Sequence, residues 1–350
     1  NDQASVMPPD TQTLMPAALK AAGYTTGMAG KWNGVGGDPE QFFDETHHAT
    51  KWGTNYFNVG RFSPLNWGPE EPGDPYHTDL LTDAACDFIK RRKDDTFFFY
   101  LAYHAPHSPF RAKAEHQEKV AHLETEPQRV YAAMCLSIDV GVARVMKTLE
   151  DNGLAEDTMV VFVSDNGPAT GSSRLRGYKE DWPDMVMGVT GPLSGHKKTL
   201  REGGIRMPFI MRYPARLKKR VADDFVVSTL DLYPTFCALA GVKPPESNAV
   251  DGMDLMPHLA GQTEGPRPGN LYWALGRGRI NDGAVRSGDW KLHVEHERDY
   301  TKLEIEALYN LAEDIGEQTD VAAAHPDVAA RLLADYKQWL SRMGPPAWKR

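Results

Sequence analysis

The chain has 350 residues, of which 41% are hydrophobic and 25% are charged, a composition ordinary for a globular protein with a substantial core. Its net charge of -9 and isoelectric point near 5.8 argue against a general nucleic-acid binder, because phosphate backbones require a basic surface. No segment approaches the roughly 18 consecutive apolar residues of a membrane span. The cysteines Cys86, Cys135 and Cys237 match no zinc or CxxC spacing and allow at most one disulfide.

Short apolar runs alternate with segments of helical periodicity over most of the chain. In chain order, we predict strands at 23–32, 96–103 (TFFFYLAY), 158–163 (TMVVFV) and, more weakly, 206–213, and helices around 80–89 and 131–149. Near-continuous apolar runs are typical of strands that are buried on both faces. This alternation predicts an α/β fold with a mainly parallel sheet that has helices on both faces.

The last part of the chain has a different texture, rich in Gly, Pro and Arg and followed by short alternating stretches at 284–294 and 307–311. Such stretches predict a small antiparallel subdomain. An amphipathic helix is expected from about 326 to 340. We therefore expect the main α/β domain to comprise residues 1–260 and the C-terminal antiparallel subdomain, with its terminal helix, residues 261–350.

The tract Ser164-Asp165-Asn166-Gly167 directly follows one of the predicted strands. Its side chains therefore lie at a strand's carboxyl end, where open α/β sheets bind ligands. Carboxylate and amide oxygens suit a hard cation such as Ca²⁺ or Mg²⁺. Taken alone, Asp-Asn-Gly is also a common turn sequence, and a turn is the favoured interpretation of an isolated match.

Cationic and titratable side chains occur at similar positions. Lys197 lies in the basic tract 195–206 and offers a compact charge suited to an oxyanion, although a solvated basic loop is the simpler interpretation. His107 follows a predicted strand between two prolines and could donate a proton to a leaving oxygen or bind an anion. A rigid turn histidine explains His107 equally well. Lys31 lies at the end of the first predicted strand.

In combination and in this order, four motifs resemble the sulfatase family of the alkaline phosphatase superfamily. They are GYxT…GKW at 23–32, APHSP at 105–109, SDNG at 164–167 and KxxxxEGGxRxP at 197–208. Later tracts such as DLYPT and LYNL are also similar to that family, so the resemblance covers essentially the whole chain. It implies an alkaline phosphatase-like fold and hydrolysis of sulfate monoesters.

The resemblance also implies a role for individual residues. Asp165 and Asn166 would ligate a divalent cation, Ca²⁺ or alternatively Mg²⁺. Lys31 and Lys197 would hold the sulfate, and His107 would contact its bridging oxygen. The implied ligand is a sulfated small molecule or glycan, such as a sulfated sugar or an aryl sulfate, and the implied location is periplasmic or secreted.

One departure from the family pattern concerns position 33. The family motif GKWH reads Gly30-Lys31-Trp32-Asn33 here, so an amide stands where an imidazole is expected. Asn33 cannot relay a proton near neutral pH, but its amide can donate a hydrogen bond. We therefore expect Asn33 to bind substrate without serving as an acid or base.

A second departure concerns the nucleophile. Sulfatases use a formylglycine made from Cys or Ser in a C/S-x-P/A-x-R signature, and neither this signature nor the family's first-strand aspartate pair occurs in this sequence. We expect the chain to hold part of the site, to depend on a complementing N-terminal fragment and to lack activity unaided. Two alternatives stay open, namely a non-catalytic protein that binds sulfated glycans, and a phosphodiesterase or phosphonate monoester hydrolase.

Overall fold

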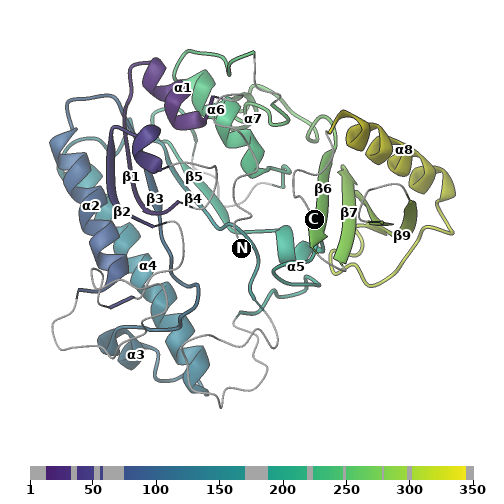
Figure 1. Ribbon diagram of the computed structural model, residues 1–350, viewed down its shortest axis with the longest axis horizontal. Helices are drawn as coiled ribbons and strands as arrows, with labels where there is room; N and C mark the ends of the chain where they lie inside the picture. The colour runs from purple at the N-terminus through teal and green to yellow at the C-terminus, as the bar shows by residue number, and fades with distance from the viewer. Residues whose placement is uncertain are drawn as a thin grey trace.

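The computed structural model describes residues 13–32, 38–50, 56–57, 75–169, 188–218, 224–246, 250–277, 280–297 and 302–343, and Asn33 therefore lies outside the described residues. Figure 1 shows a helix-covered body that contains β1 to β5, beside a separate sheet that carries α8. Among the described residues, no helix is long and apolar enough to cross a membrane.

The body is built around a three-stranded parallel sheet. Its order is β2 (Glu45–Thr50), β1 (Thr25–Lys31) and β3 (Phe97–Ala102), so β1 is central. Beside it, β4 (Val160–Val163) and β5 (Phe209–Arg212) form an antiparallel pair. The predicted mainly parallel sheet is confirmed, and β5 runs antiparallel to β4, as edge strands of mainly parallel sheets commonly do.

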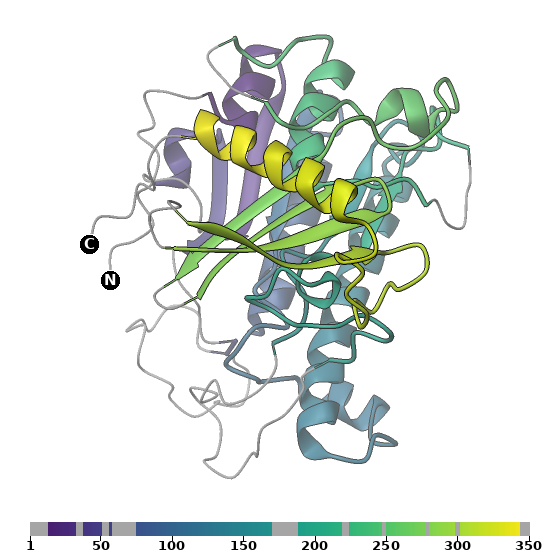
Figure 2. The ribbon, with the colours of Figure 1, turned by 90° about the vertical axis from the view of Figure 1, so that its right-hand side faces the viewer.

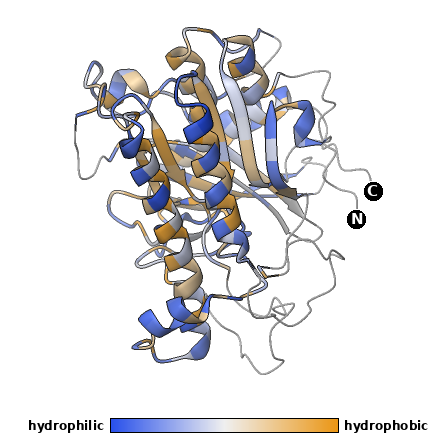
Figure 3. Ribbon diagram, turned by 90° about the vertical axis from the view of Figure 1, so that its left-hand side faces the viewer, coloured by the Kyte–Doolittle hydropathy of each residue, from blue (hydrophilic) through white to orange (hydrophobic). Residues whose placement is uncertain are grey.

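Within the described residues, the α-helices of this body are α1 (Met15–Ala21), α2 (His77–Arg91), α3 (Ala114–Lys119), α4 (Glu126–Asp151), α5 (Glu202–Ile205), α6 (Leu232–Leu239) and α7 (Met256–Leu259). The long helix α4 begins at a capping box, in which Thr125 accepts from the backbone of Gln128 while the Gln128 side chain accepts from Thr125. Figure 3 views the side on which α2 and α4 lie in front of the strands.

Alternation along β3 explains why helices cover both faces of the sheet. Phe97 and Phe99 contact Phe88 of α2, with ring centroids 5.8 and 4.8 Å apart. Phe98 points to the opposite face, where its ring lies 6.0 Å from that of Phe236 in α6. Successive strand residues face opposite sides, so one apolar run contacts two helical layers.

Two of the apolar strands are less buried than the sequence predicts. Tyr100 of β3 is 43% exposed and Phe162 of β4 is 36% exposed, which corrects the prediction that both strands are buried on both faces. The physical reason is their pairing. Within the described residues, β3 is hydrogen-bonded to β1 alone and β4 to β5 alone, so each is an edge strand.

The C-terminal part forms a four-stranded antiparallel sheet. Its order follows the chain: β6 (Leu271–Arg277), β7 (Ile280–Ser287), β8 (Trp290–His296) and β9 (Leu303–Asn310). Figure 2 shows α8 (Pro326–Arg342) lying across this sheet. Leu332 and Tyr336 of α8 pack with strand residues such as Leu292 in one apolar cluster. The predicted antiparallel sheet and terminal helix are confirmed, whereas the division at residue 260 stays a prediction.

His77, the first residue of α2, is a fully buried polar side chain in this body. Its ring lies 5.0 Å from that of His104, and neither ring nitrogen has a hydrogen-bond partner among the described residues. Burial, followed by the charges of His104 and His48, lowers the pKa of His77 to about 3. The folded protein therefore holds this imidazole neutral, whereas an unfolded histidine titrates near pH 6.5.

We expect His77 to make the protein less stable in mild acid. Between pH 6.5 and 3 the unfolded chain binds a proton that the folded chain excludes, so stability falls as the pH falls through this window. Lowering the pH from about 7.5 to 5 should remove about 2 kcal/mol through this one group. Urea unfolding at both pH values should show that His77→Gln loses about 2 kcal/mol less than the wild type. The exposed His122→Gln serves as the control, and equal losses in His77→Gln and wild type would contradict this account.

Candidate functional site

Two of the predicted site residues lie at the carboxyl ends of neighbouring parallel strands. Lys31 is the last residue of β1 and is half-buried. His107 follows β3, where the segment that contains it has cis peptide bonds at Ala105-Pro106 and Ser108-Pro109. The backbone of His107 is held on both sides, because its N–H donates to the His104 carbonyl (2.9 Å) and its carbonyl accepts from the Tyr56 hydroxyl (2.8 Å).

The ring of His107 has a defined protonation pattern. Its Nδ1 lies 2.7 Å from the Ser108 carbonyl, which can only accept, so Nδ1 carries the hydrogen and Nε2 is an acceptor in the neutral ring. Nε2 becomes a donor to an oxyanion once the ring takes a second proton. Burial, with the charges of Lys197 and Lys31, lowers the pKa of His107, although the Ser108 carbonyl and Asp165 act in the opposite direction.

Asp165 and Asn166 follow β4 directly, as the sequence predicts. Asp165 is exposed, and the Asn166 amide nitrogen donates to the Gly167 carbonyl at 2.9 Å, which leaves its oxygen as the atom that suits a cation. The Gly167 N–H donates to the Gly204 carbonyl (3.0 Å), and the Lys197 N–H donates to the Pro168 carbonyl (2.9 Å). These two bonds join the segment after β4 to α5 and to the loop that carries Lys197.

Three charged residues lie close enough to His107 to shift its pKa. The charges of Lys197, Lys31 and Asp165 all shift the pKa of His107. Burial and then the charge of Asp165 raise the pKa of Tyr100, which places the end of β4 near β3 as well. Thus the structure brings together residues from the ends of β1, β3 and β4 and from one loop. Their individual roles stay predictions.

The donor set for a cation is only partly present among the described residues. The carboxylate of Asp165 and the amide oxygen of Asn166 are hard oxygen ligands of the kind that Ca²⁺ and Mg²⁺ prefer. Within the described ranges, no group of three or more His, Cys, Asp and Glu side chains is arranged to hold a metal ion. These two residues therefore fit a divalent cation chemically, and six to eight ligands around Ca²⁺ would need further oxygens.

A buried charge cluster, which sequence reasoning missed, lies behind the Lys197 loop. Lys291 Nζ lies 2.8 Å from Glu202 Oε1 and 3.0 Å from Glu317 Oε1, and His293 Nε2 lies 2.8 Å from the same Glu317 oxygen. These side chains are at most 4% exposed. The sequence shows Glu202 within the EGG motif, but no pattern in the sequence indicates that its partners are Lys291 on β8 and, through Lys291, Glu317 after β9.

Arg201, to which the sequence assigned no role, also bridges to the C-terminal sheet. Its Nη1 donates to the Tyr309 hydroxyl and to the Glu317 carbonyl, both at 3.0 Å, and its guanidinium lies 5.3 Å from the centre of the Tyr309 ring. Charge and aromatic contact together fix this arginine. Arg201 is therefore a structural link between the loop and the sheet.

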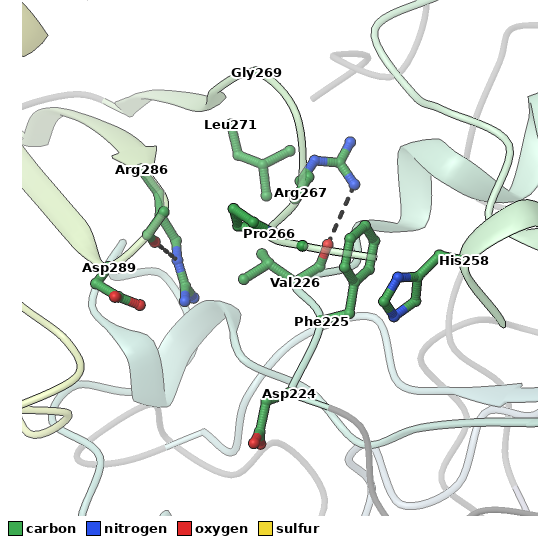
Figure 4. A pocket seen from close by; sticks show the side chains of 12 residues that line it. Asp224, Phe225, Val226, His258, Pro266, Arg267, Gly269, Leu271, Arg286 and Asp289 are labelled. Carbon is green, nitrogen blue, oxygen red and sulfur yellow. Dashed lines mark hydrogen bonds between the residues drawn. The ribbon is translucent and has the colours of Figure 1, made fainter. Parts of the chain in front are cut away.

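A cavity of about 500 Å³ lies near this junction (Figure 4). Phe225 and His258 stack on one side of it, with ring centroids 3.8 Å apart, and Arg286 and Asp289 lie on the other. Its lining includes none of the predicted site residues. We therefore place the candidate site by the converging strand ends and not by this cavity.

The chain is similar to known proteins over most of its length. Residues 1–242 match the family model "Sulfatase", and residues 195–342 match "N-sulphoglucosamine sulphohydrolase, C-terminal". The chain is 33% identical to the N-acetylgalactosamine-6-sulfatase of Sus scrofa over 81% of this chain and 55% of that protein. It is 29% identical to the uncharacterized sulfatase YdeN of Escherichia coli (strain K12) over 97% of this chain and 68% of that protein. The chain thus spans about half the length of the first of these relatives.

Solved structures share the fold. Ps i-CgsB in complex with k-i-k-neocarrahexaose superposes with a TM-score of 0.77 and 26% identity, covering 95% of this chain and 74% of that one. The phosphonate monoester hydrolase SpPMH from Silicibacter pomeroyi has a TM-score of 0.61 at 17% identity, covering 94% of this chain and 80% of that one, and shows the fold alone. The parallel sheet with helices and the four-stranded antiparallel sheet fit an alkaline phosphatase-like fold with a small subdomain.

Gly167 packs against the backbone of α5 so closely that no side chain should be tolerated there. A Cβ at Gly167 would lie 1.8 Å from the Gly203 carbonyl oxygen, which is backbone and cannot rotate away. Gly167→Ala should therefore lower the free energy of unfolding by at least about 2 kcal/mol, measured by urea denaturation. Gly153→Ala serves as the comparison, since open space surrounds its Cβ and only its positive φ of 71° disfavours alanine, so it should cost about 1 kcal/mol. A smaller loss for Gly167→Ala than for Gly153→Ala would show that Gly167 is not packed as described.

Proposed function

Because this chain belongs to the sulfatase family, we propose that its converging strand ends form part of a site that binds a sulfate monoester for hydrolysis. One observation carries the proposal. The charges of Lys31, Lys197 and Asp165 all act on His107, so cations, an imidazole and a carboxylate from four separate motifs share one place. The carboxyl ends of strands in open α/β sheets are where ligands bind.

Each cation has a specific task in this proposal. Lys31 and Lys197 would hold the sulfate oxygens through charged hydrogen bonds, each contributing roughly 1.5 to 3 kcal/mol. His107 would contact the bridging oxygen through Nε2, which becomes a donor when the ring is charged. Asn33, which lies outside the described residues, would add a neutral hydrogen bond to the substrate.

Sulfatases generally use a metal ion and a formylglycine. Asp165 and Asn166 would supply two oxygen ligands to a Ca²⁺ ion, or to Mg²⁺ in its place, and the cation would neutralise charge on the sulfate. This assignment is supported by the position of both residues after β4 and by the hydrogen bond that orients the Asn166 amide.

We further propose a sulfated sugar as the substrate class. Support comes from the relative of Sus scrofa, whose name specifies N-acetylgalactosamine 6-sulfate chemistry, and from Ps i-CgsB, solved with a neocarrahexaose. This chain covers only part of each of these two proteins. The substrate is therefore proposed here from their names and not taken over as a property of this chain. A secreted or periplasmic location, implied by the family, belongs to this proposal too.

Replacing single lysines tests the sulfate site. Lys31→Met and Lys197→Met should each weaken the affinity for inorganic sulfate roughly 10- to 100-fold in isothermal titration calorimetry, because each removes a charged hydrogen bond. Lys198→Met is the matched control, since Lys198 is the exposed neighbour of Lys197 and should leave sulfate affinity unchanged. Equal effects of Lys197→Met and Lys198→Met would refute the assignment.

The whole protein, incubated with p-nitrophenyl sulfate and p-nitrophenyl phosphate, separates the alternatives. Hydrolysis of the sulfate ester supports the proposed enzyme. Sulfate binding without turnover of either ester supports a protein that binds sulfated glycans, and turnover of the phosphate ester alone supports a phosphate or phosphonate ester hydrolase.

Metal binding is tested by thermal unfolding with and without Ca²⁺. The wild type should gain unfolding temperature with rising Ca²⁺, because a ligand that binds only the folded state stabilises it. Asp165→Asn should reduce this gain, since it replaces a charged ligand by a neutral one. Asp157→Asn, an exposed position on the amino side of β4, is the control. An unchanged Ca²⁺ response in Asp165→Asn would remove Asp165 from the ligand set.

A further inference from the structure

We propose that Glu317 is a positioning residue for Lys197, because its one carboxylate fixes both ends of the loop that carries this lysine, residues 194–202. The inference rests on the proposed function and deepens it. It assigns to a residue beyond β9, in the C-terminal part of the chain, control over a sulfate-binding group of the main body.

Both ends of the loop are bound to the same oxygen. The Ser194 hydroxyl donates to Glu317 Oε2 at 3.3 Å, and the backbone N–H of Glu202 donates to Oε2 at 2.6 Å. The Gly203 N–H then donates to the Ser194 carbonyl at 2.6 Å, which closes the loop at its base. Glu317 Oε2 therefore fixes the positions of both ends of the loop.

The other oxygen of Glu317 is anchored to β8. Oε1 lies 3.0 Å from Lys291 Nζ and 2.8 Å from His293 Nε2, and Lys291 also binds Glu202 Oε1 at 2.8 Å. The carboxylate is fully buried, so any movement would leave charges unpaired in a low dielectric. The C-terminal sheet thus holds the carboxylate, and the carboxylate holds the loop.

The backbone of Glu317 adopts a strained conformation in this position. Its φ is +53°, in the left-handed region that disfavours residues with a Cβ. Strain of this kind persists where surrounding contacts determine the conformation. The Glu317 carbonyl also accepts from Arg201 Nη1 at 3.0 Å, so a third bond ties this residue to the loop.

The loop itself transmits the constraint to Lys197. The His196 N–H donates to Thr199 Oγ1 at 3.0 Å, and Thr199 Oγ1 donates back to the His196 carbonyl at 2.8 Å, which makes a tight turn around Lys197. The Lys197 N–H is bound to the Pro168 carbonyl at 2.9 Å. A turn this short moves as a unit, so shifting its base shifts the Lys197 ammonium relative to Lys31 and His107.

A double-mutant cycle tests the inference with inorganic sulfate as the probe. Glu317→Gln should weaken sulfate affinity roughly 10-fold, a loss usual for residues that orient a ligand-binding group. The double variant Glu317→Gln/Lys197→Met should bind sulfate no more weakly than Lys197→Met alone, because Glu317 acts only through Lys197. Glu304 on β9 forms a surface ion pair with Lys302, so Glu304→Gln is the matched control and should leave the sulfate affinity unchanged.

The outcomes separate the two proposals. If Lys197→Met leaves sulfate affinity unchanged, the proposed sulfate site is wrong and the positioning role falls with it. If Lys197→Met weakens binding while Glu317→Gln leaves it unchanged, or if the two losses simply add, only the positioning role is overturned. A change in stability alone would indicate that Glu317 serves the fold.

Ser194→Ala provides a milder variant if Glu317→Gln does not fold. It removes one hydrogen bond to the carboxylate and should weaken sulfate affinity roughly threefold. Hydrogen exchange should also become faster at the amides of Lys197 and Gly203, with β6 and β7 unchanged. Unchanged exchange together with unchanged affinity would overturn the inference.

Discussion

The contacts of the buried Glu317 carboxylate hold the Lys197 loop against the C-terminal sheet, and the position of the candidate site depends on them. Taking a carboxylate and an ammonium out of water costs several kcal/mol each, and only well-formed contacts offset that cost. Burial raises the pKa of Glu317. Its contacts with His293, Lys291 and the backbone N–H of Glu202 outweigh burial, and together they lower this pKa to about 2. The carboxylate is therefore ionised at any pH well above 2. A charge cluster of this kind specifies one relative position of loop and sheet.

The candidate site places positive charge locally on an acidic protein. The chain carries a net charge of -9, yet the charges of Lys197 and Lys31 add to burial in lowering the pKa of His107. Local fields of one sign concentrate ligands of the opposite sign. An anionic ligand bound at the strand ends would meet these cations.

The elements of the fold follow from local patterns, and their pairing does not. Alternation along Phe97, Phe98 and Phe99 is visible in the sequence as an apolar run, and the structure divides it between α2 and α6. The run at β5 was visible as well, but its antiparallel pairing with β4 depends on where the intervening segment returns the chain. Tyr100 and Phe162 show the same limit, because the exposure of an apolar residue depends on which strand lies beside it.

The sequence by itself determined the fold class, the C-terminal sheet and helix, and the candidate site residues at strand ends, because each depends on periodicity or on a short motif. It could not reveal that Glu317 and Lys291 meet Glu202, since these residues are separated by 115 and 89 positions along the chain. No local pattern distinguishes a glutamate in a buried ion cluster from one on the surface. Only the packing of the C-terminal sheet against the Lys197 loop decided that, because burial and charge pairing are properties of segments brought together in space.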